Sequence, residues 1–155
     1  MSRRSRADAD DGLTVALYSD DRVLRDQVIL AIGDRLADDL PPVRIVEFAT
    51  APALMAAMED DRFDCLILDA ETAPLGGMGV SYQVKDEFRS PPPVVLLVAR
   101  LADAWLATWS RADAVVGLPV DPLTLPGQVA DVVRADRAGT LADRTTVPGA
   151  ASRHA

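Results

Sequence analysis

Three aspartates stand directly after apolar runs of strand length, where carboxylates can hold a metal ion or react. Asp20 and Asp21 follow the run at residues 14–18, and Asp69 ends the run at residues 63–69. Clustered carboxylates supply the oxygen ligands that Mg²⁺ prefers, and one of them could attack a phosphoryl group as a nucleophile. The alternative role is structural, because Asp is also a favoured N-cap for a helix that follows a strand.

Other catalytic and metal chemistries lack the residue types that they need. The sequence contains one cysteine, Cys65, and one histidine, His154. These counts exclude an internal disulfide, a cysteine-based zinc site, a His-rich metal site and a Ser/His/Asp triad. A flavodoxin-like nucleotide-binding enzyme is also disfavoured, because the first strand is not followed by a glycine-rich phosphate-binding motif.

Composition predicts one acidic globular domain. The chain has 155 residues, of which 49% are hydrophobic and 26% charged, and its net charge is -8. This charge disfavours nucleic acids and anionic membrane surfaces as partners. The sequence has neither a membrane-spanning run of about 18 apolar residues nor a secretory signal. We therefore expect a cytoplasmic protein with no direct membrane insertion.

The elements that must position the aspartates alternate between strand and helix. Apolar runs predict strands at residues 14–18, 43–49, 63–69, 94–99 and 113–119, and helical spacing predicts helices at 22–37, 52–61, 80–89, 103–110 and 121–135. This alternation predicts an α/β protein with a parallel sheet covered by helices on both faces. The carboxyl ends of the strands share one edge, so Asp20 and Asp69 are expected in one pocket.

The predicted domain organisation is a folded unit between two tails. Residues 1–12 and 137–155 are small, charged or polar and lack an apolar face, so we expect flexible tails there. Residues 13–136 carry the alternating pattern and form the predicted domain.

The chain resembles a response-regulator receiver domain from about Leu13 to Ala135. The resemblance implies a flavodoxin-like, doubly wound five-stranded parallel sheet with strand order 2-1-3-4-5. The phosphoacceptor aspartate of the family matches Asp69 in LILDAE. Its metal-binding acid pair matches Ser19 and Asp20 or, one residue along, Asp20 and Asp21. The resemblance thus implies that Asp20, Asp21 and Asp69 are candidate ligands of Mg²⁺, and it requires no other cofactor.

Three positions depart from the family pattern. The Thr or Ser at the end of the fourth strand falls on Val98 or Ala99, the switch aromatic on Val115, and the lysine before a cis-proline on Leu118. The hydroxyl and ammonium groups that bind the phosphoryl oxygens are therefore replaced by apolar side chains. The resemblance implies an atypical receiver, or pseudo-receiver, in which Asp69 is a degenerate phosphoacceptor.

We expect this chain to act through protein contacts and not as an enzyme. Receivers usually control an output domain, and after Arg134 only a short tail follows in the sequence. Trp105 and Trp109 are spaced i, i+4 on one predicted helix, and tryptophan is enriched at interface hot spots. One of the two is expected in the core, and Trp109 is the better surface candidate. Arg134 and Arg137 are candidates for contacts with acidic patches.

A narrower resemblance concerns the partner. Several stretches are similar to orphan receiver-like proteins of mycobacteria and related actinobacteria: YSDD, LDAETAPLGGMG, QVKDE, WLATWSRADAVV and PVDP. The genes of those proteins lie beside the genes for respiratory complex I, the proton-pumping NADH dehydrogenase. This implies an accessory or regulatory subunit on the cytoplasmic side of the complex, peripheral to the plasma membrane. The alternative is a single-domain response regulator that accepts a phosphoryl group on Asp69 from a histidine kinase.

Overall fold

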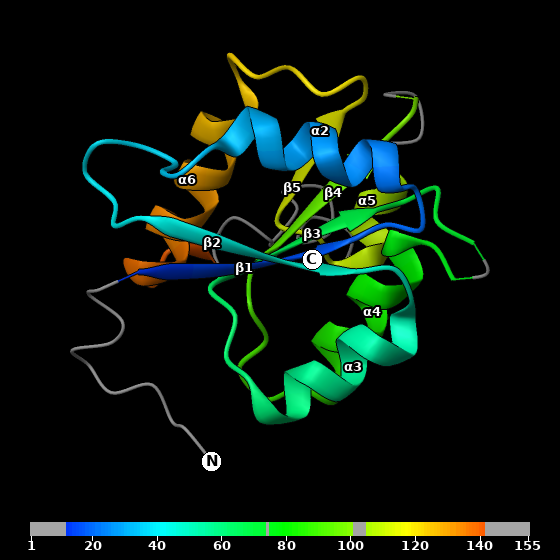
Figure 1. The fold of residues 1–155 in the computed structure, drawn as a ribbon. Coiled ribbons are helices and arrows are strands. Elements are labelled where there is room, and N and C mark those ends of the chain that lie inside the picture. The colour runs from blue at the N-terminus through cyan, green and yellow to red at the C-terminus, as the bar shows by residue number, and fades with distance from the viewer. Residues whose placement is uncertain (1–11, 74, 101–104, 142–155) are drawn as a thin grey trace.

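The computed structural model describes residues 12–73, 75–100 and 105–141. Its five strands form one parallel sheet in the order β2-β1-β3-β4-β5 (Figure 1). The strands are β1 (Leu13–Tyr18), β2 (Val43–Phe48), β3 (Cys65–Asp69), β4 (Val94–Val98) and β5 (Ala114–Gly117). The predicted doubly wound, flavodoxin-like sheet and its strand order are confirmed.

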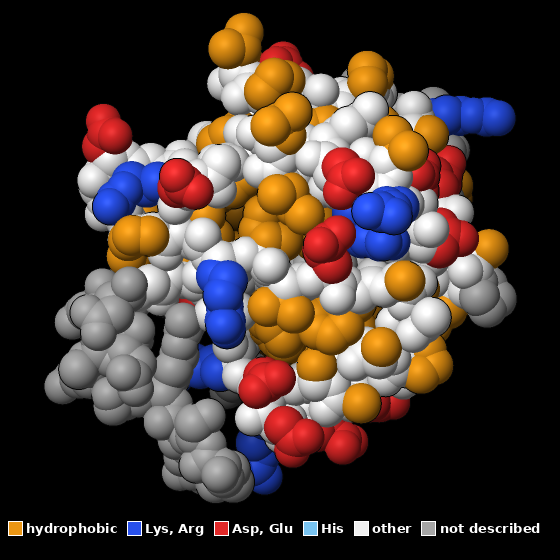
Figure 2. Space-filling view, viewed as in Figure 1, with side chains coloured by type: hydrophobic (Ala, Val, Ile, Leu, Met, Phe, Trp, Pro, Cys, Tyr) orange, Lys and Arg blue, Asp and Glu red, His pale blue; other side chains and the backbone are white. Residues whose placement is uncertain are grey.

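The middle of the sheet is buried on both faces. Every residue of β1, β3 and β4 is buried, whereas the edge strand β2 is only half-buried. Continuous apolar runs are typical of strands covered by helices on both sides, which explains why these segments show no alternation. In Figure 2, apolar side chains reach the surface on the face where α2 and α3 flank the edge strand β2.

Helices pack on both faces of the sheet and divide the core into two clusters. The helices are α2 (Arg22–Ile32), α3 (Ala51–Asp60), α4 (Gly77–Glu87), α5 (Leu106–Ser110) and α6 (Leu125–Arg137). On one face α2 and α6 bury their apolar stripes against side chains of β1, β3 and β4. On the other face α3 and α4 cover the alternate side chains of these strands, and α5 packs beside α4. None of the helices in the described residues has the length and apolarity that a membrane span requires.

Helix α2 is shorter than predicted. The side chain of Asp21 caps its first turn by accepting hydrogen bonds from the backbone N–H groups of Val23 and Leu24. The helix stops at Ile32, and Gly33, which follows it, has φ 64°, a non-helical backbone conformation that favours glycine. The apolar spacing nevertheless continues to Leu36, which is buried in the core from the loop beyond the helix.

The predicted tails lie mainly outside the described residues. Residues 1–11 and 142–155, including His154, are not described. The predicted domain boundary after residue 136 falls inside α6, and Leu141 is buried in the first core cluster. The packed part of the chain thus reaches at least Leu141.

Candidate functional site at the carboxyl edge of the sheet

Asp69 lies at the end of β3 with only 3% of its surface exposed. Its Oδ1 accepts the backbone N–H of Glu71 at 2.9 Å, which is the hydrogen bond of an Asx-turn. Its Oδ2 accepts two hydroxyl groups, Ser19 Oγ at 2.7 Å and Thr72 Oγ1 at 3.1 Å. Both carboxylate oxygens are therefore engaged by neutral donors.

The two hydroxyls link Asp69 to the backbone that follows β1. Ser19 Oγ accepts the N–H of Asp21 at 3.0 Å while it donates to Asp69. Thr72 Oγ1 accepts the N–H of Asp20 at 3.2 Å while it donates to the same carboxylate oxygen. Such a connected network satisfies buried polar groups and fixes their geometry. The β1–α2 and β3–α4 loops are thereby joined through Asp69.

Asp20 and Asp21 have different positions relative to Asp69. Asp20 is exposed, and its Oδ2 accepts the backbone N–H of Ala73 at 3.4 Å. The carboxylate of Asp21 is turned to the first turn of α2, where it serves as the N-cap. Of the two registers left open by the sequence, this geometry matches the one with Ser19 and Asp20 beside Asp69.

The predicted three-aspartate magnesium site is not formed as a cluster. Within the described ranges, no group of three or more His, Cys, Asp or Glu side chains is placed to hold a metal ion. Asp21 is committed to capping, and Ser19 occupies the place next to Asp69 that a second carboxylate would need. The donor set present at Asp69 does not fit Mg²⁺, which favours carboxylate oxygens and water over a pair of donating hydroxyls.

Two glycines let the β3–α4 loop close tightly over the end of β3. A Cβ on Gly76 would lie 2.4 Å from the carbonyl oxygen of Ala70. A Cβ on Gly77, the first residue of α4, would lie 2.8 Å from the backbone carbonyl group of Asp69. Close backbone approach is therefore what requires glycine at these two positions.

Tyr18 connects this site to the neighbouring face of the sheet. Its hydroxyl donates to the carbonyl oxygen of Leu75 at 2.5 Å. Burial raises the pKa of the Tyr18 phenol, and the negative charges of Asp20 and Asp69 raise it further. The electrostatic influence of both acids thus reaches Tyr18.

The positions that match the phosphoryl-sensing residues of receivers carry only apolar groups. Val98 is buried at the end of β4, Val115 is half-buried in β5, and Leu118 is half-buried before Pro119 with a cis peptide bond between them. In the described part of the chain, neither Lys nor Arg forms an ion pair with Asp69.

The one lysine of the sequence lies at the opposite edge of the sheet. Lys85 Nζ is 2.7 Å from Asp113 Oδ2, and the two side chains are only 12% and 1% exposed. The same Oδ2 accepts the N–H of Val94, the first residue of β4, at 2.7 Å. Asp113 Oδ1 is buried and has no hydrogen-bond partner among the described residues. Receivers place a lysine ammonium beside the phosphoacceptor. In this protein the ammonium of Lys85 instead forms a structural pair with Asp113 at the other edge of the sheet.

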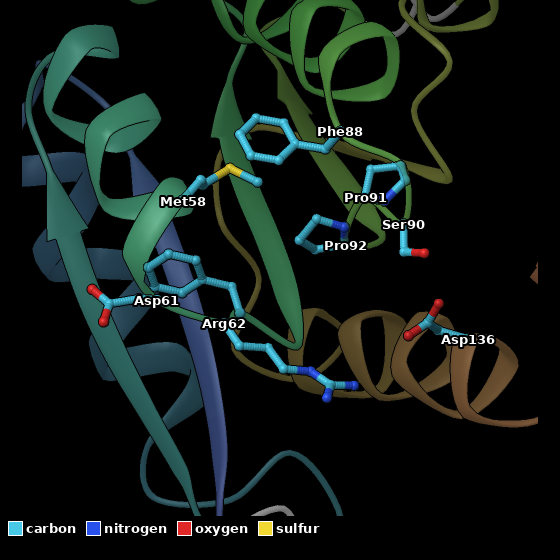
Figure 3. A pocket seen from close by; sticks show the side chains of 9 residues that line it. Met58, Asp61, Arg62, Phe88, Ser90, Pro91, Pro92 and Asp136 are labelled. Atoms are coloured by element: carbon cyan, nitrogen blue, oxygen red, sulfur yellow. The ribbon is translucent and has the colours of Figure 1, made fainter. Parts of the chain in front are cut away.

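A hollow of about 340 Å³ lies near this amino edge, between α3, α4 and α6 (Figure 3). Met58 and Phe88 form an apolar wall, and Arg62 and Asp136 point toward it from different elements. Burial raises the pKa of Asp136, as do the negative charges of Asp113 and Asp64, whereas Lys85 and Arg62 lower it. The ionisable groups around this hollow are separate from the Asp69 site.

The predicted interface residues lie on two different surfaces. Trp105 and Trp109 are 70% and 58% exposed, so the expectation that one of them is a core residue is wrong. The Trp109 ring stacks on Tyr82 of α4 at 5.0 Å, and the Arg111 guanidinium lies 4.9 Å from the centre of the same Tyr82 ring. Tyr82 lies on α4, Trp109 on α5 and Trp105 directly before α5, and we call these three exposed side chains the aromatic cluster Tyr82–Trp105–Trp109.

The two arginines of α6 stand apart from these aromatic rings. The Arg134 guanidinium donates two hydrogen bonds to the Asp39 carboxylate, at 2.9 and 2.6 Å, and a third hydrogen bond to Asp131 Oδ1 at 3.1 Å. The hydrogen bond from Arg134 lowers the pKa of Asp39, and the same bond raises the pKa of Arg134. Arg137 is the exposed last residue of α6. Arg134 thus serves an intramolecular contact between α6 and the loop after α2.

Two residues that shape the Asp69 site were not singled out from the sequence. Thr72 follows Asp69 by three residues, a spacing at which a turn after a strand brings a side chain back over the carboxylate. Arg25 donates to the carbonyl oxygen of Ser19 at 2.7 Å and pairs with Glu47 at 3.1 Å. The Asx-turn spacing is a signal for Thr72, whereas the Arg25 contact depends on how α2 lies against β2.

Comparison with known proteins places the chain among response regulators. No family model matches it. Uncharacterized response regulatory proteins of two Mycobacterium tuberculosis strains are each 44% identical over 128 residues, which is 83% of this chain and 96% of theirs.

Solved receiver structures share the fold at low sequence identity. A CheY-like receiver domain protein of Methanospirillum hungatei superposes with a TM-score of 0.65 and 17% identity, covering 82% of this chain and 98% of its own. The receiver domain of a Francisella response regulator superposes with a TM-score of 0.68 and 13% identity, covering 80% of this chain and 98% of its own. With the mycobacterial relatives and the Asp69 position at the end of β3, these findings show that the chain belongs to the response-regulator family and has its receiver-domain fold.

Proposed function

We propose that this chain is a pseudo-receiver, a non-catalytic protein-interaction module that works without phosphoryl signalling. The observation that carries the proposal is the occupation of Asp69. Its two oxygens accept the hydroxyls of Ser19 and Thr72 and the N–H of Glu71. A carboxylate engaged in this way is a weak nucleophile, and among the described residues it belongs to no group of three or more acids placed to hold a metal ion.

Charge supports the same proposal. A phosphoryl group on Asp69 would add about -1.5 to -2 charges. The protein already carries a net charge of -8, and its single lysine is paired with Asp113 at the other edge of the sheet. The matching position, Leu118, supplies no cation. A phosphorylated state would therefore be poorly stabilised and poorly sensed.

The proposal is tested by phosphorylation in solution. The protein is incubated with acetyl phosphate and Mg²⁺ and followed by intact-mass spectrometry, and we expect no stoichiometric phosphoryl adduct. The double variant Ser19→Asp/Leu118→Lys returns a carboxylate and an ammonium to the site and is expected to gain an adduct that Asp69→Ala removes. Rapid stoichiometric labelling of the unaltered protein at Asp69 would overturn the proposal.

The proposed contact surface is the aromatic cluster Tyr82–Trp105–Trp109. Large exposed aromatic side chains are the residues most enriched at interface hot spots. Trp105 and Trp109 are more than half exposed, and the stacking of Trp109 on Tyr82 holds its ring in place before a partner binds. A preorganised ring loses less side-chain entropy on binding than a free one.

For the partner, we propose subunits of respiratory complex I on the cytoplasmic side of the plasma membrane, with this chain as a peripheral accessory subunit. Support comes from the resemblance of its sequence stretches to the orphan receiver-like proteins of mycobacteria, and the 44% identity to response regulatory proteins of M. tuberculosis supports that mycobacterial relationship. Any electron transfer would belong to the partner complex.

A pull-down from solubilised membranes with a tagged copy tests this partner. We expect mass spectrometry to recover NADH dehydrogenase subunits with the unaltered protein and to recover fewer with Trp109→Ala. Leu30→Ala is the matched control, because Leu30 is an exposed apolar residue on α2, a helix of the other face. Equal recovery with Trp109→Ala would remove the aromatic cluster from the interface.

The alternative function is a single-domain response regulator that accepts a phosphoryl group on Asp69 from a histidine kinase. The observation that favours it is the placement of Asp69 at the end of β3 with Asp20 nearby, where both acids influence Tyr18. Recovery of a histidine kinase without complex I subunits, together with phosphoryl transfer to Asp69, would establish this alternative.

A further inference from the structure

A second pocket lies next to the Asp69 site, on the α3 and α4 side of the sheet. It has a volume of about 570 Å³, within the range of roughly 300–1,000 Å³ that small-molecule sites occupy. Its walls come from the ends of β1 and β2, the start of α3 and the β3–α4 loop: Tyr18, Ala49, Pro52, Met55, Ala73 and Leu75. In doubly wound sheets, ligands bind beyond the carboxyl ends of the strands at the point where the strand order reverses. Here that point lies between β1 and β3, and Tyr18 of β1 and residues of the β3–α4 loop, which line the pocket, border it.

The lining selects for an uncharged ligand. Most of the wall is apolar, and none of the described residues that line it is Lys, Arg, Asp or Glu. Asp20 and Asp69 lie close enough to Tyr18 to raise its pKa, so the potential at this end of the pocket is negative and disfavours anions. The Tyr18 hydroxyl gives its hydrogen to Leu75, so its oxygen can accept one from a ligand.

The β3–α4 loop lines the pocket and also contacts Asp69. Ala73 and Leu75 line the pocket, and the carbonyl oxygen of Leu75 is bound by Tyr18. In the same loop, Thr72 donates to Asp69, and the N–H of Ala73 is bound by Asp20. A ligand that displaces Ala73 or Leu75 therefore changes the hydrogen bonds of the acidic site, because adjacent residues of one short loop cannot move independently.

We propose that this pocket binds an uncharged, mainly apolar small molecule, and that the β3–α4 loop couples its occupancy to the hydrogen-bond network of Asp69. The binding site differs from the aromatic cluster on α4 and α5 and does not depend on which protein partner the chain has. It gives the receiver fold an input other than phosphorylation.

Binding is tested with two fluorescent probes that share one skeleton. N-phenylnaphthylamine is neutral and apolar, and anilinonaphthalene sulfonate adds an anionic group to the same rings. We expect saturable binding of one neutral probe per protein molecule, and affinity for the anionic probe that is weaker by about tenfold or more. Equal affinity for both probes, or binding without saturation, would overturn the proposed selectivity.

A filling variant locates the probe. Ala49→Leu places a larger side chain in the pocket wall and is expected to weaken binding of the neutral probe by about tenfold. Ala56→Leu is the matched control, because Ala56 is an exposed residue of α3 that does not line the pocket. Ala73→Leu fills the pocket from the other side and replaces Ala49→Leu if that variant fails to fold. Unchanged affinity in a folded filling variant would place the probe elsewhere.

The coupling is read from backbone amide signals in NMR spectra. Addition of the neutral probe is expected to shift the amides of Glu71, Thr72 and Asp20 as well as those of pocket residues. In Thr72→Val the link to Asp69 is cut, so the shift at Asp20 should shrink while probe affinity stays within about twofold. Probe binding that leaves Glu71, Thr72 and Asp20 unshifted would show a pocket without coupling to Asp69.

Discussion

The hydroxyl groups of Ser19 and Thr72 each accept a backbone N–H and donate to the same oxygen of Asp69. A second carboxylate in the place of Ser19 would repel Asp69 unless a cation stood between them. Serine removes that repulsion and makes the buried aspartate stable without a metal ion. Serine instead of a carboxylate at position 19 thus changes what the Asp69 site can bind, while the positions of the strands stay the same.

The pairing of Lys85 with Asp113 leads to a prediction about stability. Lys85→Met leaves Asp113 buried with an uncompensated charge, and loss of one partner of a buried pair costs about 3–5 kcal/mol. We expect a loss of that size in the free energy of unfolding, measured by urea denaturation.

Two further variants separate the charge from the packing at this position. Lys85→Met/Asp113→Asn removes both charges and is expected to recover part of the loss. Arg111→Met breaks an exposed pair with Asp86 at 3.9 Å and should cost less than about 1 kcal/mol. A double variant as unstable as Lys85→Met would contradict the buried-charge explanation.

Among the elements, the start of α4 matters most for the site. Gly77 begins this helix against the backbone of Asp69, so α4, β3 and the loop between them form one tightly packed corner. The corner holds Thr72 over the carboxylate and Leu75 over Tyr18. The geometry of the site is therefore set by backbone packing as much as by side-chain hydrogen bonds.

Gly77→Ala tests this corner. Its new Cβ would lie 2.8 Å from the carbonyl group of Asp69, which is backbone and cannot rotate away. We expect α4 to shift and the free energy of unfolding to fall by about 1–3 kcal/mol in urea denaturation.

Gly79→Ala is the matched control in the same helix. There the Cβ would meet Leu75 Cδ1, the end of a side chain that can turn aside, and alanine favours the helix by up to about 1 kcal/mol. Gly79→Ala should therefore be neutral or stabilising. Equal effects of the two substitutions would contradict the close-approach argument.

The sequence predicted the strands better than the helix ends. Uninterrupted apolar runs locate β3 and β4 because only a sheet covered on both faces buries such runs. The end of α2 was predicted too late, because Leu36 keeps helical spacing although Gly33 has already left the helix. Asp69 could be identified from its strand end, but its hydroxyl partners depend on the paths of two loops. The exposure of Trp105 depends on how α5 is turned, which spacing alone does not determine.

At the scale of the whole molecule, the two edges of the sheet carry different chemistry. The carboxyl edge holds an aspartate that is bound by hydroxyls. The amino edge holds the buried Lys85–Asp113 pair and the hollow beside Asp136. The single lysine is at the amino edge, whereas Arg25 pairs with Glu47 near the carboxyl edge.

The amino edge also predicts a pH dependence, at Asp136. Because the pKa of Asp136 is raised above its ordinary 3.8, the folded protein holds that proton more tightly than the unfolded chain. The stability that the protonated Asp136 carboxyl contributes is present below pH 3.8 and is lost as the pH rises through the folded-state pKa of Asp136. Asp136→Asn should thus gain stability relative to the unaltered protein across that window, by less than about 0.5 kcal/mol because solvent screens the carboxylate.

The measurement is the difference in unfolding free energy between Asp136→Asn and the unaltered protein from pH 3.5 to 7, so that the titration of other acids cancels. Asp131→Asn is a control on the same helix, because Asp131 pairs with Arg134 at the surface. A difference that stays constant with pH for Asp136→Asn would contradict the raised pKa.

The burial of Lys85 also decides how complexes of this protein can be captured chemically. Amine-reactive cross-linkers target the α-amino group and lysine side chains, and the sequence offers one lysine, Lys85, whose side chain is 12% exposed and bound to Asp113. Carboxyl-directed reagents, in contrast, have 24 Asp and Glu residues as targets. A cross-linking map built on lysine chemistry would give this protein no lysine–lysine links within the chain, so contacts with a partner are better traced through its acids.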